Sequence, residues 1–529
     1  MAENINYTNI PQEKFTFASN EGRLHDKKLE TKPIGYLKDA WLRFKKNKGS
    51  IIGACVVLFL VLFAIIGPYC YPKNYQEAYA TDTHLRRYQY LPPKIPFMEG
   101  TGIWDGTKDR EISEAQRLKF IAMAEEKNKE TIVKIYDSYQ IADPAYEGGY
   151  KLLHKAKIDQ YAIIDTFTLT FTEEQWVEIQ AWQDENEVQL ILPWVDEKLV
   201  KTNFKDMNIW YHSDQYGNPL NAEGEITDNP DEFINIYLTR GTDMYTSKLR
   251  LDGDPGIEDP TSADRWRYAK VSGKKGALSY TVRVDAYNYF TYKYGFEPYF
   301  VFGSSANGWD VFTRLAGGAR FSLLFALAVS AINLFIGAIY GAIEGYYGGK
   351  ADLIMERISD ILASIPSMVV TVLFNLHLSA KVGVVPALLY AFIMTGWIGM
   401  ASRTRMQFYR FKNQEYVLAA RTLGARDRRI MFKHIFPNSL GTLITSSVLV
   451  IPGVIYSETS LTYLGIINLD SPTRSSVGAM LSAGQSDFIA HPYLVLFPAL
   501  FIGLLMISFN LFGNGLRDAF NPSLRGTEE

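Results

Sequence analysis

The sequence predicts an all-α membrane protein with six membrane-spanning helices and a large α+β insertion between the first and second helices. Three observations predict this fold class. Apolar and charged residues are segregated along the chain, although its mean hydropathy is only -0.07. Several apolar runs reach about 20 residues, enough to cross the hydrocarbon core of a bilayer as helices. One stretch of about 230 residues lacks such a run and is large enough to form its own core.

Composition excludes several classes of protein. The chain has 529 residues and a formal net charge of -3, which excludes a strongly basic nucleic-acid binder. Its 14% aromatic content is too high for a disordered chain. The two cysteines, Cys55 and Cys70, cannot build a disulfide framework or a four-cysteine zinc site. The seven histidines show no metal-ligand spacing. We therefore expect no metal, cofactor or catalytic residue on this chain.

The first span is predicted at residues 51–70, after an N-terminal tail that covers residues 1–50. The run from Ile51 to Tyr69 carries no charge, and a lysine- and arginine-rich segment precedes it. This asymmetry places the N-terminus in the cytoplasm. A cleaved signal peptide is the alternative, but the run begins too late and is too long for one.

Residues 71–300 are charged, tyrosine-rich and turn-rich, and they are expected to fold outside the membrane as an α+β domain. A composition rich in Glu, Ala, Lys and Gln predicts a helix over 109–134. Alternation of Phe167, Leu169 and Phe171 with threonines predicts a half-buried strand, followed by a helix that opens with a capping box. A buried strand is expected over 188–195, and 279–302 is β-prone.

The remaining residues, 301–529, are expected to form the core of the protein. Five further spans are predicted at roughly 321–340, 354–378, 384–401, 440–456 and 493–512. Six spans place both termini in the cytoplasm. Between Arg403 and Lys433 there are nine basic residues against two acids, which marks the loop 403–437 as cytoplasmic. Arg314 and Arg320 fall on the opposite, outer side and disagree with this rule.

The most informative segment runs from residue 415 to residue 437 and reads as helix, turn, helix. Residues 414–423 are good helix formers, and Gly424 is placed to end that helix in a left-handed conformation. Asp427 is expected to N-cap the next short helix, and Pro437 to stop it before the following span.

Two interpretations of this segment remain open from composition. Ala419 and Ala420 leave a small-residue surface on a basic, cytoplasmic elbow, which suits docking into the groove of a partner protein. The alternative is a basic loop beside the membrane that merely follows the excess of positive charge on the inner side.

The pattern E-x3-A-A-x3-G, from Glu415 to Gly424, resembles the coupling loop of ABC importer permeases. The longer segment through His434 and Asn438 is similar to the C-type permease subunit of oligopeptide and dipeptide importers. Further blocks resemble that family in order, over about residues 36–72 and 300–526. Trp309 departs from the family pattern, and the family loop is much shorter than residues 71–300.

The resemblance implies a MetI-like six-span fold and a role as the membrane-spanning half of an ATP-driven peptide importer. It implies as partners a second homologous permease, two ATPase subunits that carry ATP and Mg, an extracellular peptide-binding lipoprotein and membrane lipid. The location implied is a prokaryotic plasma membrane. Residues that the resemblance places in ATPase coupling are Glu415, Ala419, Ala420, Arg421, Gly424, Arg429 and Pro437. Glu458 is implied as a gate or structural residue.

Two further expectations concern what the chain does by itself. It lacks a phosphate-binding loop, since Gly348-Gly349-Lys350 has no earlier spaced glycine and no hydroxyl residue after the lysine. We therefore expect no ATP hydrolysis by this chain alone. The size of the 71–300 segment leaves an alternative function open, that of a membrane-anchored receptor or sensor whose external domain binds a ligand.

Overall fold

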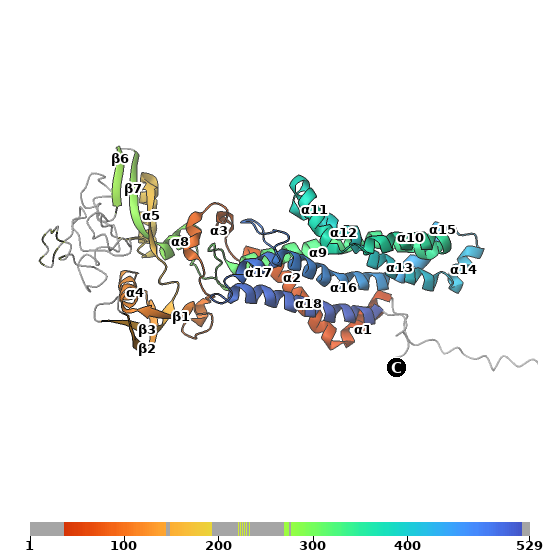
Figure 1. The fold of residues 1–529 in the computed structure, drawn as a ribbon, viewed down its shortest axis with the longest axis horizontal. Helices are drawn as coiled ribbons and strands as arrows, with labels where there is room; N and C mark the ends of the chain where they lie inside the picture. Colours follow the sequence, from red (N-terminus) through yellow and green to blue (C-terminus); the bar gives the residue numbers. More distant parts are fainter. Residues whose placement is uncertain are drawn as a thin grey trace, which may run out of the picture.

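The computed structural model describes residues 36–127, 129–143, 149–192, 269–274 and 277–520, with a few single residues between 221 and 232. The described chain forms a long helical bundle with two small β-sheets beyond one end of it (Figure 1). Five helical segments are long and apolar enough to cross a membrane, and they are Lys48–Tyr69, Val311–Tyr347, Val384–Phe411, Asp427–Tyr463 and Tyr493–Phe520. The protein is therefore mostly helical, with five spans or, counting one bent pair, six.

The bundle is built from long helices and shorter ones that join them. The helices are α1 (Tyr36–Lys46), α2 (Lys48–Ile66), α9 (Val311–Tyr347), α10 (Gly349–Ala363), α11 (Ser367–Val382), α12 (Val384–Gly396), α13 (Ile398–Phe411), α14 (Glu415–Thr422), α15 (Asp427–Arg429), α16 (Phe436–Tyr463), α17 (Val477–Gln485) and α18 (Tyr493–Phe520). The bundle core packs Leu60 of α2, Ala326 of α9, Ile455 of α16 and Leu505 of α18 together. Between membrane-spanning helices such side chains are held together by close van der Waals packing, because lipid offers them a similarly apolar environment.

The span expected at 354–378 is not one continuous helix. It is two helices, α10 and α11, bent by 71° at a short break. Ser364 ends α10, and Pro366 stands immediately before α11. Proline lacks an amide hydrogen and disfavours a helical conformation in the residue before it, so the helix breaks there. The other predicted spans are present but extend further, because polar residues at their ends remain helical.

Between α2 and α9 the chain forms a separate lobe of short helices and two sheets, which we call the inserted region. Its elements are η3 (Gly67–Tyr69), α3 (Lys73–Ala78), η4 (Thr83–Tyr88), η5 (Pro96–Met98), β1 (Thr107–Ser113), α4 (Glu114–Lys127), β2 (Ile132–Ala142), β3 (Tyr150–Asp159), β4 (Thr166–Thr172), α5 (Glu173–Asn186), β5 (Ile191–Leu192), β6 (Ala269–Lys274), β7 (Ala277–Asp285) and α8 (Ala286–Tyr294). One sheet has the order β1-β3-β2, and in the other β7 pairs with β4, β5 and β6, all antiparallel.

Local predictions in the inserted region have mixed outcomes. The strand through Phe167 and Phe171 is confirmed as β4, and the capping box of Thr172 and Gln175 is present. The helix expected over 109–134 is limited to α4, because residues 109–113 belong to β1 and residues 132–134 belong to β2. The buried strand expected over 188–195 is described only as Ile191–Leu192, and residues 193–195 lie outside the described ones.

The β structure expected over 279–302 is present up to Asp285, in β7. It is wrong over 286–294, where α8 forms. The Asp285 carboxylate accepts a hydrogen bond from the amide of Asn288 and caps this helix, and Gly295 ends it with a φ of +79°. Aromatic residues of α8 are buried among other rings, with Phe290 packed edge-on against Tyr75 and Tyr88. Tertiary packing thus overrides the strand preference of these residues.

Candidate functional site

The segment 415–437, which we call the elbow, stands at the end of the bundle opposite to the two sheets (Figure 1). Helix α14 covers Glu415–Thr422, as expected from its helix formers. Gly424 has a φ of +79°, and its amide donates to the carbonyl of Arg421 while the amide of Ala425 donates to that of Ala420. This is the paired hydrogen-bond pattern of a Schellman C-cap, which confirms the predicted role of Gly424 in ending the helix.

Two details of the predicted elbow are wrong. Asp427 does not cap the second helix, because Arg426 takes the capping position and the Asp427 carboxylate accepts a 2.6 Å hydrogen bond from the hydroxyl of Tyr346. Pro437 does not stop a helix either. The chain stays helical from Asp427 to Tyr463, through a widened π turn at Ile430–Ile435, and Pro437 lies in the first turn of α16. Proline fits there because it comes just after the π turn, where regular hydrogen bonding to the fourth preceding residue is already interrupted.

One face of the elbow is fastened to the bundle. The fully buried side chain of Val417 points into a cluster that includes Tyr346 at the end of α9 and Phe408 near the end of α13. Ile430 and Ile435 from the π turn complete this cluster. The apolar contacts make the elbow part of the same packed unit as α9 and α13, so a displacement of one moves the others.

The opposite face of the elbow is open. Six of the seven residues assigned to coupling are exposed, and the seventh, Ala420, is partly buried. Glu415 and Ala419 are four residues apart, as are Ala419 and Leu423, so the three share one side of the helix. Leu423 is 88% exposed, an unusual position for a large apolar side chain. Basic residues flank this stripe, and they line a hollow with Phe432: Arg426, Arg428, Arg429 and Lys433.

Beneath the elbow, α9 and α13 approach each other more closely than side chains would allow. Gly337, Gly341 and Gly345 recur every four residues on α9 and face the backbone of α13. A Cβ added at Gly341 would lie 2.0 Å from the carbonyl oxygen of Ala401. Small residues at this spacing are the usual means by which membrane helices pack closely.

Arg405, on α13, interacts with acidic side chains from two other helices, α10 and α9. The Arg405 guanidinium donates to both carboxylate oxygens of Asp352 at 2.6 and 2.8 Å, and to Glu356 at 2.8 Å, both on α10. Glu344 of α9 lies 3.6 Å from the same group. No side chain of α10 is fully buried. Arg405 is therefore a principal polar attachment of α10 to the bundle, and sequence reasoning missed it.

A cleft of about 560 Å³ lies among α9, α11, α12 and α16. Its wall is mixed, with apolar residues such as Phe392 and polar ones such as Thr371, Thr395 and Ser460. The side-chain oxygen of Asn333, also in this wall, has no hydrogen-bond partner among the described residues. Polar groups in the wall of a cleft between otherwise apolar spans are suited to a path for polar solute.

Glu458 lies behind this wall rather than in it. Its side chain is fully buried and accepts hydrogen bonds from Ser322 of α9 at 2.9 Å and from Thr462 at 3.3 Å. A buried acid whose oxygens are held by hydroxyl groups joins α9 to α16 as a fixed polar contact. The expected role of Glu458 as a gate or structural residue stays a prediction.

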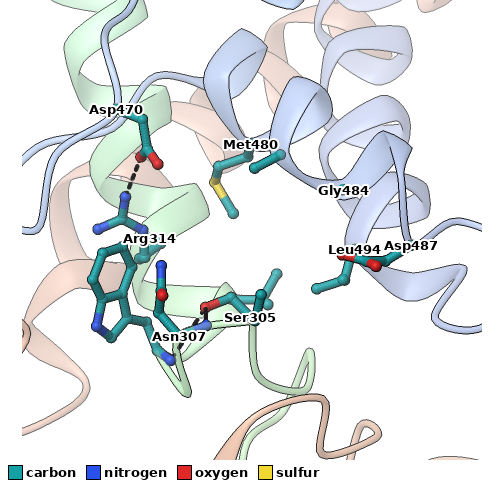
Figure 2. A pocket seen from close by; sticks show the side chains of 12 residues that line it. Ser305, Asn307, Arg314, Asp470, Met480, Gly484, Asp487 and Leu494 are labelled. Carbon is teal, nitrogen blue, oxygen red and sulfur yellow. Dashed lines mark hydrogen bonds and ion pairs between the residues drawn. The ribbon is translucent and has the colours of Figure 1, made fainter. Parts of the chain in front are cut away.

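At the end of the bundle near the sheets, a pocket of about 70 Å³ lies between the start of α9 and α17 (Figure 2). Arg314 pairs there with Asp470 at 2.5 Å and donates to the carbonyls of Ser471 and Pro472. Its guanidinium also lies 4.3 Å from the ring of Trp309. The pocket is too small for a peptide, and the arginine in its wall is already paired with Asp470.

Two stretches of the chain match known protein families. Residues 333–526 match the family described as binding-protein-dependent transport system inner membrane component. Residues 35–93 match the N-terminal TM domain of oligopeptide transport permease C. The oligopeptide transport system permease protein OppC of Bacillus subtilis is 42% identical over 224 residues, which cover 42% of this chain and 72% of that protein. The chain belongs to this family of binding-protein-dependent permeases.

Two further relatives of the permease are named for the transport of dipeptides and of glutathione. The dipeptide transport system permease protein DppC of Bacillus subtilis is 40% identical over 225 residues, 42% of this chain and 69% of that protein. The glutathione transport system permease protein GsiD of Pectobacterium atrosepticum is 32% identical over 249 residues, 46% of this chain and 81% of that protein.

Family membership settles what kind of component the permease is. It is a membrane-spanning transport subunit rather than an enzyme, and ATP hydrolysis belongs to separate subunits of such transporters. The elbow, the three glycines at 337, 341 and 345, Arg405 and all of the cleft's lining residues except Val329 lie within the matched residues 333–526. Residues 94–332, which hold most of the inserted region, lie outside both family matches.

Proposed function

We propose that the permease forms half of the pathway of an ATP-driven importer for oligopeptides, and that a second homologous permease forms the other half. The names of its relatives support peptides as the substrate class. The cleft among α9, α11, α12 and α16 is the segment of this pathway that the chain contributes, because it brings polar groups to the middle of the spans.

The exposed face of the elbow receives a cytoplasmic ATPase subunit. The supporting observation is a helix with one face locked into the bundle by Val417 and the other open at Leu423. Coupling residues on this face or beside it are Glu415, Ala419, Ala420, Arg421, Gly424, Arg429 and Pro437. ATP and Mg bind to the ATPase subunits and not to this chain. Nucleotide-driven movement of those subunits shifts the elbow and, through it, α9 and α13.

The proposed topology places the elbow in the cytoplasm and the inserted region outside a prokaryotic plasma membrane. Nine basic residues between Arg403 and Lys433 support the first assignment. The sheets lie beyond the other end of the bundle, while α1 and the end of α18 lie at the elbow's end (Figure 1). Both termini are accordingly cytoplasmic, and residues 71–300 form an extracellular domain.

The inserted region receives an extracellular peptide-binding lipoprotein. The inserted region contacts the outer ends of the spans directly. The Tyr79 and Thr313 hydroxyls are hydrogen-bonded at 3.2 Å, and Tyr493 donates to the carbonyl of Ser304 at 2.9 Å. A protein that binds this region is therefore held in a fixed orientation over the entrance.

Copurification and uptake together test the proposal. A tagged full-length chain should bring down a second permease and two ATPase subunits. Gly424→Asp should reduce peptide uptake more than Gly424→Asn does, with equal amounts of the two chains in the membrane. A Cβ at Gly424 meets no atom within 4 Å, and the strain imposed by the φ of +79° is common to both variants. Gly424→Asn, which tolerates the left-handed conformation without added charge, is the matched control. Absence of the ATPases, with function lost on removal of residues 75–298, would instead support the receptor alternative.

A further inference from the structure

A second pocket at the outer end of the bundle is unusually basic. It measures about 360 Å³ and lies between the end of α2, the first turns of α9 and the loop at residues 472–475. Arg314, Arg320 and Arg474 all line it, and none of its lining residues is acidic. Arginines on the outer side run against the usual distribution of positive charge in membrane proteins, so their presence here needs a physical reason.

Two of the three guanidinium groups are not neutralised by the protein. Arg314 is paired with Asp470. Among the described residues, Arg320 interacts with the hydroxyl of Tyr69 at 3.4 Å and with the face of the same ring. In the described parts of the chain, neither Arg320 nor Arg474 forms an ion pair with an acid. The pocket thus holds two uncompensated positive charges.

Arg320 of the pocket lies on the side of α9 that faces away from the central cleft. Arg320 of the pocket and Val329 of the cleft are nine residues apart, about two and a half turns, so they lie on opposite faces of α9. Leu324, also in its wall, is 61% exposed, and the neighbouring Tyr69 is 75% exposed. Tyrosine and arginine beside exposed apolar residues are typical of the level where headgroups meet the hydrocarbon core.

We propose that this pocket binds the phosphate headgroup of an anionic phospholipid. Guanidinium groups form bidentate hydrogen bonds with phosphate oxygens, and basic pockets between spans are known sites for anionic headgroups. Arg320 and Arg474 hold the phosphate, the hydroxyl of Thr473 lies in the same wall, and an acyl chain runs along Leu324. Only the assignment to the outer leaflet rests on the proposed transport topology; the pocket and its charges do not.

The test uses the full-length chain in its complex, in lipid nanodiscs containing either phosphatidylglycerol or phosphatidylcholine. Native mass spectrometry after detergent extraction counts the retained lipids. The wild type should retain phosphatidylglycerol preferentially, and the double variant Arg320→Gln/Arg474→Gln should lose this preference by about tenfold or more. Arg110→Gln, on the distant strand β1, removes an exposed arginine elsewhere and should change nothing.

Further arms separate the sources of the anion and guard against misfolding. Arg320→Lys/Arg474→Lys keeps both charges and should restore much of the retention. Equal retention in wild type and the glutamine variant would overturn the proposal. So would a glutamine variant that binds lipid normally but discriminates less between peptides with free and amidated C-termini, since the anion would then belong to the cargo. Failed transport with intact lipid retention would count against the transport proposal alone.

Discussion

The hydroxyl of Tyr346, at the end of α9, donates a 2.6 Å hydrogen bond to the carboxylate of Asp427 in the elbow. The two residues are 81 positions apart in sequence, and the bond joins the proposed ATPase-binding segment to a helix that lines the cleft. Arg421 adds a contact from α14, with its guanidinium 5.9 Å from the ring of Tyr346. The elbow is thus joined by a polar contact to α9, one of the helices that line the cleft.

Removing that hydrogen bond should loosen coupling. Tyr346→Phe keeps the buried ring in its cluster but leaves the carboxylate without its donor. Because a hydrogen bond to a charged group contributes about 1.5–3 kcal/mol and Asp427 is exposed to water, we expect the lower part of this range, seen as a several-fold fall in peptide taken up per ATP hydrolysed. Reconstituted complexes in vesicles provide the measurement. The neighbouring exposed Tyr347→Phe is the control, and an unchanged ratio for Tyr346→Phe would argue against the connection.

The Arg405 cluster should hold the bent pair α10–α11 in place. Arg405→Ala leaves Asp352 and Glu356 without their shared partner, and we expect slower uptake with normal ATPase docking. Arg405→Lys keeps the positive charge but cannot form the bidentate hydrogen bonds to the carboxylate, so it should recover only part of the activity. The exchange Arg405→Asp/Asp352→Arg should recover more than either single change. If all five of these variants transport as well as the wild type, the cluster has no part in the mechanism.

Close packing of α9 on α13 predicts a position-specific effect on stability. Gly341→Ala places a methyl group 2.0 Å from a carbonyl oxygen of the backbone, which the neighbouring helix must move to accommodate. Overpacking of this kind costs about 1–3 kcal/mol. Thermal melting of the purified protein should therefore shift downward. Gly399→Ala, where a Cβ meets nothing within 4 Å, should melt as the wild type does. Equal melting of both variants would contradict the packing described.

The inserted region should lose stability in acid through Asp82. Burial by itself raises the pKa of this carboxyl, but hydrogen bonds from Lys293, Tyr294 and the amide of His84 outweigh it and leave the pKa below its usual value. The carboxylate therefore stabilises the fold above the unfolded-state pKa of about 3.9, and this contribution is lost as the pH falls through the lower folded pKa.

Hydrogen exchange of α8 as a function of pH provides the measurement for Asp82. Asp82→Asn should be less protected at neutral pH, and its protection should change less between pH 5 and pH 2 than that of the wild type, the range over which such a carboxyl titrates. Asp109→Asn, on β1, is a matched change elsewhere in the same region. Parallel pH profiles for wild type and Asp82→Asn would exclude this role.

Local signals in the sequence predicted the features that depend on local physics. Apolar runs located the spans, and Gly424 was recognisable as a helix end because its role depends only on its own backbone conformation. The ends of the spans were missed because hydropathy locates the residues that can lie in lipid. It does not show how far the backbone hydrogen bonds continue the helix beyond them. Pro366 lay inside a predicted span and carried the signal for the break, although not its angle.

Long-range partners could not be predicted in the same way. Asp427 has the composition of a helix cap, and only the fold brings Tyr346 within its reach. The acids Asp352 and Glu356 are four residues apart on one face of α10, which suggests a shared partner, but nothing local identifies Arg405. The glycines at 337, 341 and 345 were readable as a packing stripe from their spacing, although their partner α13 was not.

Accessibility and cross-linking at Leu423 test the central claim most directly. In full-length chains carrying Cys55→Ser and Cys70→Ser, a single Leu423→Cys change places a thiol on the exposed elbow. The account predicts labelling by a membrane-impermeant thiol reagent only from the cytoplasmic side, protection when the ATPase subunits are bound, and a cross-link to one of them. Labelling from outside intact cells, or labelling that the ATPase subunits do not alter, would contradict it.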